Sequence, residues 1–274
     1  MTFTEMDPGQ LNDIRHLFPG LRLEMVLDSI ACGNTFGRLW TVDPADPGVL
    51  SLLWDGGNNK FYLTAGRQAS GSLAALGRLV GGEIREAAHE CGVLYFGVCA
   101  LSAAAEGLAG AAFGGFLTGR RDSLFFRAPA ARSVRRGPDP EGISFLPIDQ
   151  EFLSGAGSVV EAVRREIEWM WPSVEHFLRG GWGTAAVAGD EVLCWCTAEY
   201  VGRRLCGIGI ETVPEARNRG LGTATAARVV AEAGRRGCSP NWECGVDNPP
   251  SIRVAEKLGF QLEERTSFLV GRFE

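Results

Sequence analysis

The sequence predicts a mixed α/β protein in which a mainly antiparallel sheet is flanked by helices, with two such units in tandem. Its 274 residues exceed the size of one ordinary domain, so we expect two. Strand-like and helix-like segments follow one another in a similar order in the two halves, and a hairpin signal opens the sheet of the second half. The halves meet at the polar stretch 133–142, which places the domains at residues 1–138 and 139–274.

In the first half, short apolar runs bounded by glycine and polar residues predict strands. They lie at residues 36–42, 49–54, 61–65, 92–98 and 123–128, and a helical pattern covers about 72–90. Residues 93–117 carry a single charge, Glu106, and are long enough to span a membrane. Because this segment is rich in alanine and glycine and is interrupted by polar residues, we favour a buried strand followed by a core-packed helix.

The second half begins its sheet with a hairpin at residues 183–200, in which Gly189 and Asp190 form the two-residue turn. A buried strand at 205–213 follows and ends at Pro214. The remaining segments are a helix from about Gly220, a strand at 241–246, a short helix at 251–258 and a last strand at 264–273.

Both of these helices carry start and stop signals. The first repeats apolar residues with the spacing of one helix face, at Ala226, Val229, Val230 and Ala233. It ends in two arginines and Gly237, which suit a helix C-terminus. Gly259 can take the left-handed position after the short helix, with Phe260 packing back over the last turn.

Charge and cysteine content exclude several classes of protein. The net charge of −6 argues against nucleic acid or an anionic membrane as the main partner, although a local basic patch could override the total charge. The first ten residues lack the pattern of a secretory signal, and the eight cysteines form no C-x-x-C pair, so we expect free thiols in the cytoplasm. Cys194 and Cys196 share a strand face, but no second pair has ligand spacing, so no metal is expected.

Two arginines and two glycines crowd the junction between the buried strand and the following helix, in PEARNRGLGTA, residues 214–224. The first N–H groups of a helix have no intrahelical partner, and glycines let the backbone approach a pyrophosphate closely. The positive end of the helix adds to the attraction. The same residues also suit a solvated helix start. A dinucleotide fingerprint fits poorly because its third glycine is absent, and there is no P-loop lysine.

Arg217-x-x-Gly220-x-Gly222 matches the R/Q-x-x-G-x-G/A signature of the GNAT superfamily of N-acetyltransferases. About thirty residues on, NPPSIRVAEKLGF (248–260) resembles that superfamily's asparagine-then-KLGF segment. With EHFLRGGWGTAAV (175–187), these segments resemble the narrower group that includes the zwittermicin A resistance acetyltransferase. The resemblance covers about residues 170–272 and implies a GNAT-like fold. The first half, whose corresponding junction lacks the second glycine, is then a degenerate GNAT-like domain.

This resemblance implies that residues 139–274 bind acetyl-CoA, with the pantetheine arm held by the backbone at the strand end and the phosphates held by the glycine loop. The expected cofactor-binding set is Thr212, Val213, Arg217, Asn218, Arg219, Gly220, Leu221, Gly222, Thr223, Asn248 and Ser251. For Asn248 and Ser251 the alternative is a capping role in the short helix.

Glu211 is the predicted catalytic base, because carboxylates near this strand often deprotonate the amine in the superfamily. Alternation places it on the same strand face as Gly207 and Gly209, whose missing side chains would leave room beside it. The alternative is that Glu211 pairs with a nearby arginine. Glu199 and Asp247 are weaker choices for the base.

We therefore expect an acetyl-CoA-dependent N-acetyltransferase that transfers the acetyl group to the primary amine of a small molecule by direct attack. Ala255 stands where many superfamily members place a tyrosine acid, which leaves open a non-catalytic acyl-CoA-binding or sensing protein. An acidic protein suits a cationic amine. Trp169, Trp171 and Trp182 either line the acceptor cleft or belong to the core. The acceptor's identity and the oligomeric state stay open.

Overall fold

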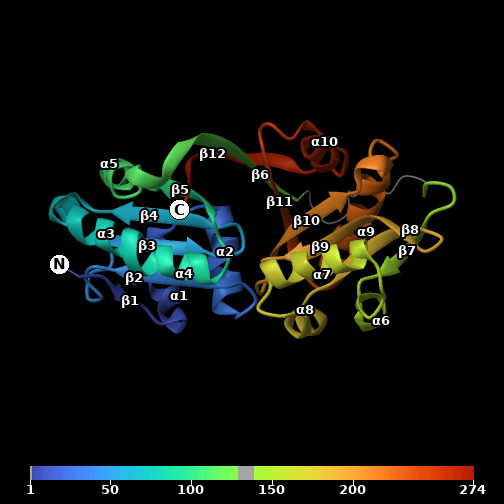
Figure 1. The fold of residues 1–274 in the computed structure, drawn as a ribbon, viewed down its shortest axis with the longest axis horizontal. Helices are drawn as coiled ribbons and strands as arrows, with labels where there is room; N and C mark the ends of the chain where they lie inside the picture. Colours follow the sequence, from blue (N-terminus) through green and yellow to red (C-terminus); the bar gives the residue numbers. More distant parts are fainter. Residues whose placement is uncertain (1, 129–138) are drawn as a thin grey trace. The chain divides into compact units, whose positions relative to one another are not determined.

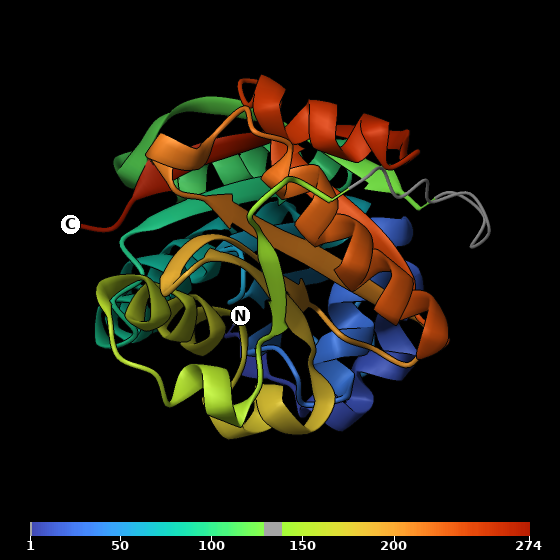
Figure 2. The ribbon, with the colours of Figure 1, turned by 90° about the vertical axis from the view of Figure 1, so that its right-hand side faces the viewer.

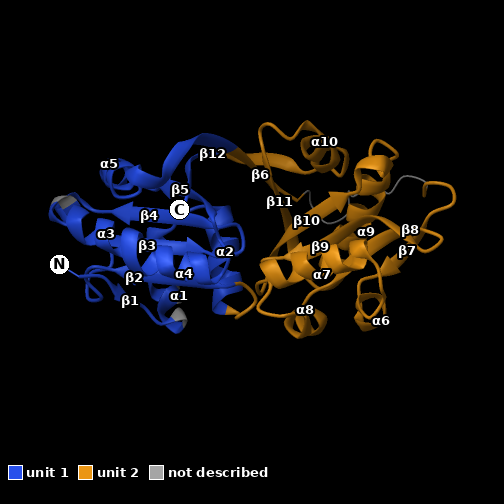
Figure 3. Cartoon of the chain, viewed as in Figure 1, with its two compact units in different colours: residues 1–31, 36–122, 266–274 blue, residues 32–35, 123–265 orange. Residues whose placement is uncertain are grey.

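A computed structural model describes residues 2–128 and 139–274 of the chain. These residues divide into two compact units, each of which combines a sheet with helices (Figure 3). Unit 1 comprises residues 1–31, 36–122 and 266–274, and unit 2 comprises residues 32–35 and 123–265. The predicted mixed α/β class is confirmed.

The sheet of unit 1 has the strand order β1-β2-β3-β4-β5-β12 (Figure 1). Its strands are β1 (Thr4–Glu5), β2 (Gly37–Thr41), β3 (Leu50–Asp55), β4 (Lys60–Ala65), β5 (Tyr95–Ala100) and part of β12 (Gln261–Arg272). Only β4 and β5 pair parallel; the other neighbours pair antiparallel. The helices are α1 (Leu11–Ile14), α2 (Leu21–Ala31), α3 (Leu73–Leu79), α4 (Arg85–Glu90) and α5 (Ala103–Ala112).

The sheet of unit 2 has the order β6-β11-β10-β9-β8-β7. Its strands are part of β6 (Leu117–Arg127), β7 (Ser144–Pro147), β8 (Gly183–Ala188), β9 (Glu191–Glu199), β10 (Leu205–Thr212) and β11 (Ser239–Gly245). Again a single neighbouring pair, β10 and β11, is parallel. The helices are α6 (Gln150–Leu153), α7 (Ser158–Met170), α8 (Val174–Gly180), α9 (Leu221–Arg235) and α10 (Pro249–Lys257).

The two sheets follow the same succession, and each takes its last strand from the other half of the chain. Three antiparallel strands lead to a parallel pair, and a further antiparallel strand closes the series: β12 beside β5 in unit 1 and β6 beside β11 in unit 2. The backbone N–H and C=O groups at the open edge of the parallel pair are thereby satisfied. The tandem arrangement expected from element order is present, with an exchange of strands that the order did not indicate.

The predicted boundary between residues 138 and 139 lies at the edge of the segment 129–138, outside the described residues. The compact units divide the chain elsewhere, because β6 and β12 each run from one unit into the other. Residues 266–274, expected in the second domain, belong to the compact unit formed by the first half. The division into domains at residues 1–138 and 139–274 stays a prediction.

Helices α7 and α9 cover opposite faces of the unit 2 sheet (Figure 2). Alternation along β9 shows this directly: Cys194 packs with Leu221 of α9, whereas Trp195 donates a hydrogen bond to Glu166 of α7. The apolar face predicted for α9 is buried as expected, and Gly237 takes a left-handed conformation just beyond the helix.

The parallel pairing of β10 with β11 stops before either strand ends. It runs from Leu205–Ser239 to Ile208–Trp242, and no further pair forms between them in the described residues. Both strands nevertheless continue, to Thr212 and to Gly245. The sheet therefore opens into a gap at this point, and the facing backbone groups of Gly209–Thr212 are available to another partner.

Residues 93–117 form a strand followed by a core-packed helix, as expected. The strand is β5 and the helix is α5, whose Ala105 and Ala109 are fully buried. Within the described part of the chain, no helix has the length and apolar character that a membrane crossing requires.

Candidate active site

The chain turns sharply between β10 and α9. A 3₁₀ turn at Pro214–Ala216 follows the strand, and Asn218 and Gly220 have φ values of 63° and 81°. Positive φ is costly for most residues and easy for glycine, which is therefore well suited to the position just before α9. A Cβ atom added to Gly220 would meet no atom within 4 Å beyond its chain neighbours, so the space above it is open.

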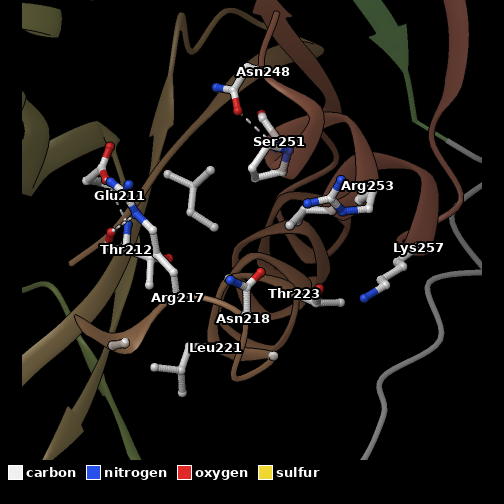
Figure 4. Close-up of a pocket in the computed structure, with 16 residues that line it drawn as sticks. Glu211, Thr212, Arg217, Asn218, Leu221, Thr223, Asn248, Ser251, Arg253 and Lys257 are labelled. Carbon is white, nitrogen blue, oxygen red and sulfur yellow. Dashed lines mark hydrogen bonds and ion pairs between the residues drawn. The ribbon is translucent and has the colours of Figure 1, made fainter. Parts of the chain in front are cut away.

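A pocket of about 440 Å³ lies where this loop, the end of β10 and helix α10 meet (Figure 4). Its volume falls in the range usual for sites that bind small molecules. The lining residues are Ile210, Glu211, Thr212, Ala216, Arg217, Asn218, Gly220, Leu221, Gly222, Thr223, Asn248, Pro250, Ser251, Arg253, Val254 and Lys257.

The pocket brings together all the residues predicted for the site except Val213 and Arg219. Val213 instead packs against the small apolar cluster that includes Ala216 and Leu221, and its N–H donates to the Leu193 carbonyl. The side chain of Arg219 is exposed and is not among the lining residues.

Two cations of the pocket, Arg253 and Lys257, were missed from the sequence. They lie on α10, across the pocket from Glu211 (Figure 4). Their spacing of four residues places them on one helix face, which is a signal that could have found them once Asn248 was recognised as the start of α10. With Arg217 they give the pocket three cations against one carboxylate, Glu211, so its lining has a net positive charge.

Glu211 forms an ion pair at the border of the pocket. Its Oε1 lies 3.1 Å from Nη2 of Arg217 and accepts a hydrogen bond from the N–H of Thr212 at 3.2 Å. Arg217 also donates from Nε to the Thr212 carbonyl at 3.1 Å, so it ties the loop to the strand end. The alternative foreseen for Glu211, pairing with an arginine, is present; a role as base stays a prediction.

The room expected beside Glu211 is filled. A side chain on Gly209 would collide with the carboxylate of Glu199, and one on Gly207 would press on the ring of Tyr200 at 3.3 Å. The glycines are needed because these neighbouring side chains lie across β10. The expectation that they leave an empty space was wrong.

The start of α10 uses both of its predicted polar residues. The Asn248 side chain caps the helix by accepting from the N–H of Ser251 at 3.2 Å, and the Ser251 hydroxyl accepts from Nε1 of Trp242 at 2.9 Å. The Asn248 amide N–H₂ group remains as a donor beside the pocket. Ala255 is completely buried, and none of the three tyrosines lines this pocket.

Cys194 lies on the α9 face beneath the pocket, where Thr212 Oγ1 approaches its Sγ at 3.2 Å. Burial raises the pKa of the Cys194 and Cys196 thiols, which disfavours their thiolate forms. In the ranges that the structure describes, no three His, Cys, Asp or Glu side chains converge as metal ligands would.

The model of a protein family described as GNAT acetyltransferase matches residues 15–269. This match includes both units and the whole pocket. The chain belongs to the GNAT acetyltransferase family. A relative from Bacillus subtilis (strain 168), the uncharacterized N-acetyltransferase YdfB, is 33% identical to this chain over 122 residues. Those residues are 44% of this chain and 46% of YdfB, so the match spans about half of that relative.

Two solved structures share the GNAT fold over nearly the whole chain. A GCN5-related N-acetyltransferase-like protein from Streptococcus suis 89/1591 has a TM-score of 0.66 and 17% identity, covering 96% of this chain and 98% of that one. A tandem GNAT protein from the clavulanic acid biosynthesis pathway has a TM-score of 0.60 and 15% identity, covering 99% and 98%. The second likeness supports the interpretation of the chain as two GNAT-like units.

Proposed function

We propose that the protein is an acetyl-CoA-dependent N-acetyltransferase, which passes the acetyl group to the primary amine of a small molecule by direct attack. The observation that carries the proposal is the gap between β10 and β11, which opens at the glycine loop before α9. Membership in the GNAT acetyltransferase family supports the reaction class, because these enzymes use acetyl-CoA as co-substrate.

The pyrophosphate is proposed to lie over Gly220, at the N-terminus of α9. The N–H groups of the first helical turn, from Leu221 to Thr223, lack intrahelical partners and border the pocket. The open space above Gly220 lets a phosphate approach the backbone. Arg217 lines the same pocket and adds positive charge from the strand end, where it pairs with Glu211. Arg219 does not line the pocket, so the proposal gives it only a long-range electrostatic attraction for the phosphates.

The pantetheine arm is proposed to lie in the gap beside Gly209–Thr212, where its amides take the place of the missing strand partner. Asn248 and Ser251 flank the gap from α10 and would contact the arm. Glu211 borders the pocket at the strand end, so the proposal places it beside the acceptor amine.

Arg253 and Lys257 are proposed to hold the 3′-phosphate at the outer end of coenzyme A. Both lie beyond Ser251 along α10, away from the gap, and both are exposed. Arg253→Ala or Lys257→Ala should weaken coenzyme A binding about tenfold, since one lost charge-assisted contact is worth about 1.4 kcal/mol. Dephospho-coenzyme A, which lacks this phosphate, should bind the variants and the wild type alike in calorimetric titrations.

Arg204→Ala is the matched control, because Arg204 is an exposed cation at the other end of β10. It should leave both affinities unchanged. Equal weakening of coenzyme A and dephospho-coenzyme A in the α10 variants would reject the placement of the 3′-phosphate.

The acceptor is proposed to be a small cationic amino compound. The acidic net charge supports this class, as does the resemblance to the zwittermicin A resistance group. A second candidate function, non-catalytic acyl-CoA binding, is favoured by the buried Ala255 at the position of the usual tyrosine acid.

Turnover separates the two candidate functions. Acetyl-CoA is titrated into the protein by calorimetry, and release of the free coenzyme A thiol is then followed with a panel of primary amines. Binding together with amine-dependent release supports the acetyltransferase. Binding without release from any amine supports the non-catalytic protein, and no binding at all rejects both.

A further inference from the structure

One carboxylate of unit 2 lies outside the pocket and is held in place by the sheet. Glu166 projects from α7 onto the face of β9 opposite α9. Nε1 of Trp195 donates to its Oε2 at 2.7 Å, and Oγ1 of Thr197 donates to its Oε1 at 3.4 Å. The side chain is only partly buried, and each oxygen can accept a further proton or hydrogen bond.

Trp195 connects this carboxylate to the border of the pocket. In the antiparallel register of β9 and β10, Trp195 lies directly opposite Glu211, so their side chains share one sheet face. Glu211 lines the pocket because β10 ends immediately after it. The cofactor pocket and the α7 face of the sheet therefore meet at Glu211. Its cross-strand neighbour, Trp195, is the residue that holds Glu166.

The two carboxylates differ in their partners. Oε1 of Glu211 is occupied by Arg217 and by the N–H of Thr212. Glu166 has two hydrogen-bond donors, but no lysine, arginine or histidine within the described ranges forms an ion pair with it. A carboxylate without a neighbouring cation is the better proton acceptor, because no positive charge stabilises its ionised form.

The surroundings of Glu166 also make it a better proton acceptor. Burial raises the pKa of its carboxyl above the ordinary value, and the charge of Glu211 adds to this effect, while the hydrogen bonds from Trp195 and Thr197 oppose it. A carboxylate with a raised pKa takes a proton more readily at neutral pH, which is the usual way in which proteins adapt a glutamate to work as a base.

We infer that Glu166 is the catalytic base of the proposed acetyl transfer and that Glu211 holds the acceptor's ammonium group at the pocket border. The inference rests on the proposed N-acetyltransferase function. Glu166 takes one proton from the ammonium group, and the neutral nitrogen attacks the thioester carbonyl carbon. The C–N bond forms and the C–S bond breaks. The electron pair leaves with sulfur, which takes a second proton from nitrogen, and Glu166 returns its proton to water.

The test compares Glu166→Gln, Glu211→Gln and the control Glu168→Gln, whose exposed side chain lies on the same helix. Two kinds of acceptor are used: alkylamines from propylamine to spermidine, and hydroxylamine, whose nitrogen is already unprotonated at neutral pH. Glu166→Gln should lower kcat/KM for the alkylamines about 10²- to 10⁴-fold, the usual contribution of a general base. Transfer to hydroxylamine should fall far less, since no proton has to be removed first.

Glu211→Gln should raise KM for the alkylamines and change kcat little, as loss of a binding contact does. Glu168→Gln should behave as the wild type. The inference is overturned if Glu166→Gln matches this control, if it impairs both kinds of acceptor equally, or if the selective loss appears in Glu211→Gln. In those cases the proposed function stands. A wild type that binds acetyl-CoA but acetylates nothing would reject the proposed function together with this role of Glu166.

Thermal unfolding distinguishes a catalytic role from a structural one. Because folding raises the pKa of Glu166, the ionised group works against folding at neutral pH. Glutamine keeps an acceptor for Trp195 without the charge. The Tm of Glu166→Gln at neutral pH should therefore equal or exceed that of the wild type, with acetyl-CoA affinity unchanged. A clear fall in Tm or affinity would mean that Glu166 is structural and would overturn the inference.

Discussion

Gly220→Asp is expected to lower acetyl-CoA affinity by a factor of about a hundred or more. The substitution places a carboxylate over the N-terminus of α9, where the pyrophosphate is proposed to lie, and like charges in contact cost several kcal/mol. The left-handed backbone at Gly220 strains aspartate, but a negative charge at the N-terminus of a helix is favourable, so α9 itself should persist. Calorimetric titration of acetyl-CoA into the wild type and the variant measures the difference.

Gly220→Asn is the matched control, because asparagine has the shape of aspartate without its charge. Asparagine tolerates the left-handed backbone better than most residues, and the space above Gly220 is open to a side chain. It should therefore keep much more of the affinity than aspartate does. Equal affinities in Gly220→Asp and the wild type would mean that the phosphates bind elsewhere.

The glycine loop could be predicted from the sequence because its signals are local. The turn needs residues that accept positive φ, and the helix after it needs an apolar face; both requirements are met within about twenty consecutive residues. The same holds for the cap of α10, where Asn248 and the C-terminal Gly259 mark the two ends. Most of the predicted pocket residues fall in these two segments.

Glu166 could not be found in this way, because what distinguishes it is tertiary. Its helix carries three glutamates. Glu166 alone lies three residues after Val163 and four before Met170, on the apolar face, but spacing does not say which groups it contacts. Only the packing of α7 on β9 gives Glu166 the indole of Trp195 and the hydroxyl of Thr197. Likewise, the side chains that fill the space over Gly207 and Gly209 come from the neighbouring strand and the turn after it, so alternation along β10 alone suggested an empty space.

The exchange of strands was also hidden from sequence patterns. A strand pattern predicts an extended segment and one buried face, but it does not name the neighbour that completes the hydrogen bonding. The last strand follows α10 directly, and a boundary at the polar stretch 133–142 places it in the second domain. In the structure its final residues pair with β5, from Leu269–Val98 to Arg272–Tyr95.

Phe273→Ala is expected to destabilise unit 1 by about 3 to 5 kcal/mol, the usual cost of removing a fully buried phenylalanine. The ring of Phe273 lies 4.4 Å from that of Phe96 and 5.2 Å from that of Phe116, centroid to centroid, within the aromatic core of the unit. Its N–H also donates to the Leu94 carbonyl at 2.9 Å. Thermal unfolding should show a fall in Tm of about 10 °C or more.

Leu262→Ala provides the control, since Leu262 lies in β12, the strand that Phe273 follows, with 56% of its surface exposed. Its loss should change the free energy of unfolding by no more than about 0.5 kcal/mol. A large effect at Phe273 beside a small one at Leu262 would mean that the C-terminal residues complete the core of the first half. A chain cut between residues 138 and 139 would then leave the first half without the strand that closes its core. Equal, small effects would instead favour two halves that fold independently at the predicted boundary.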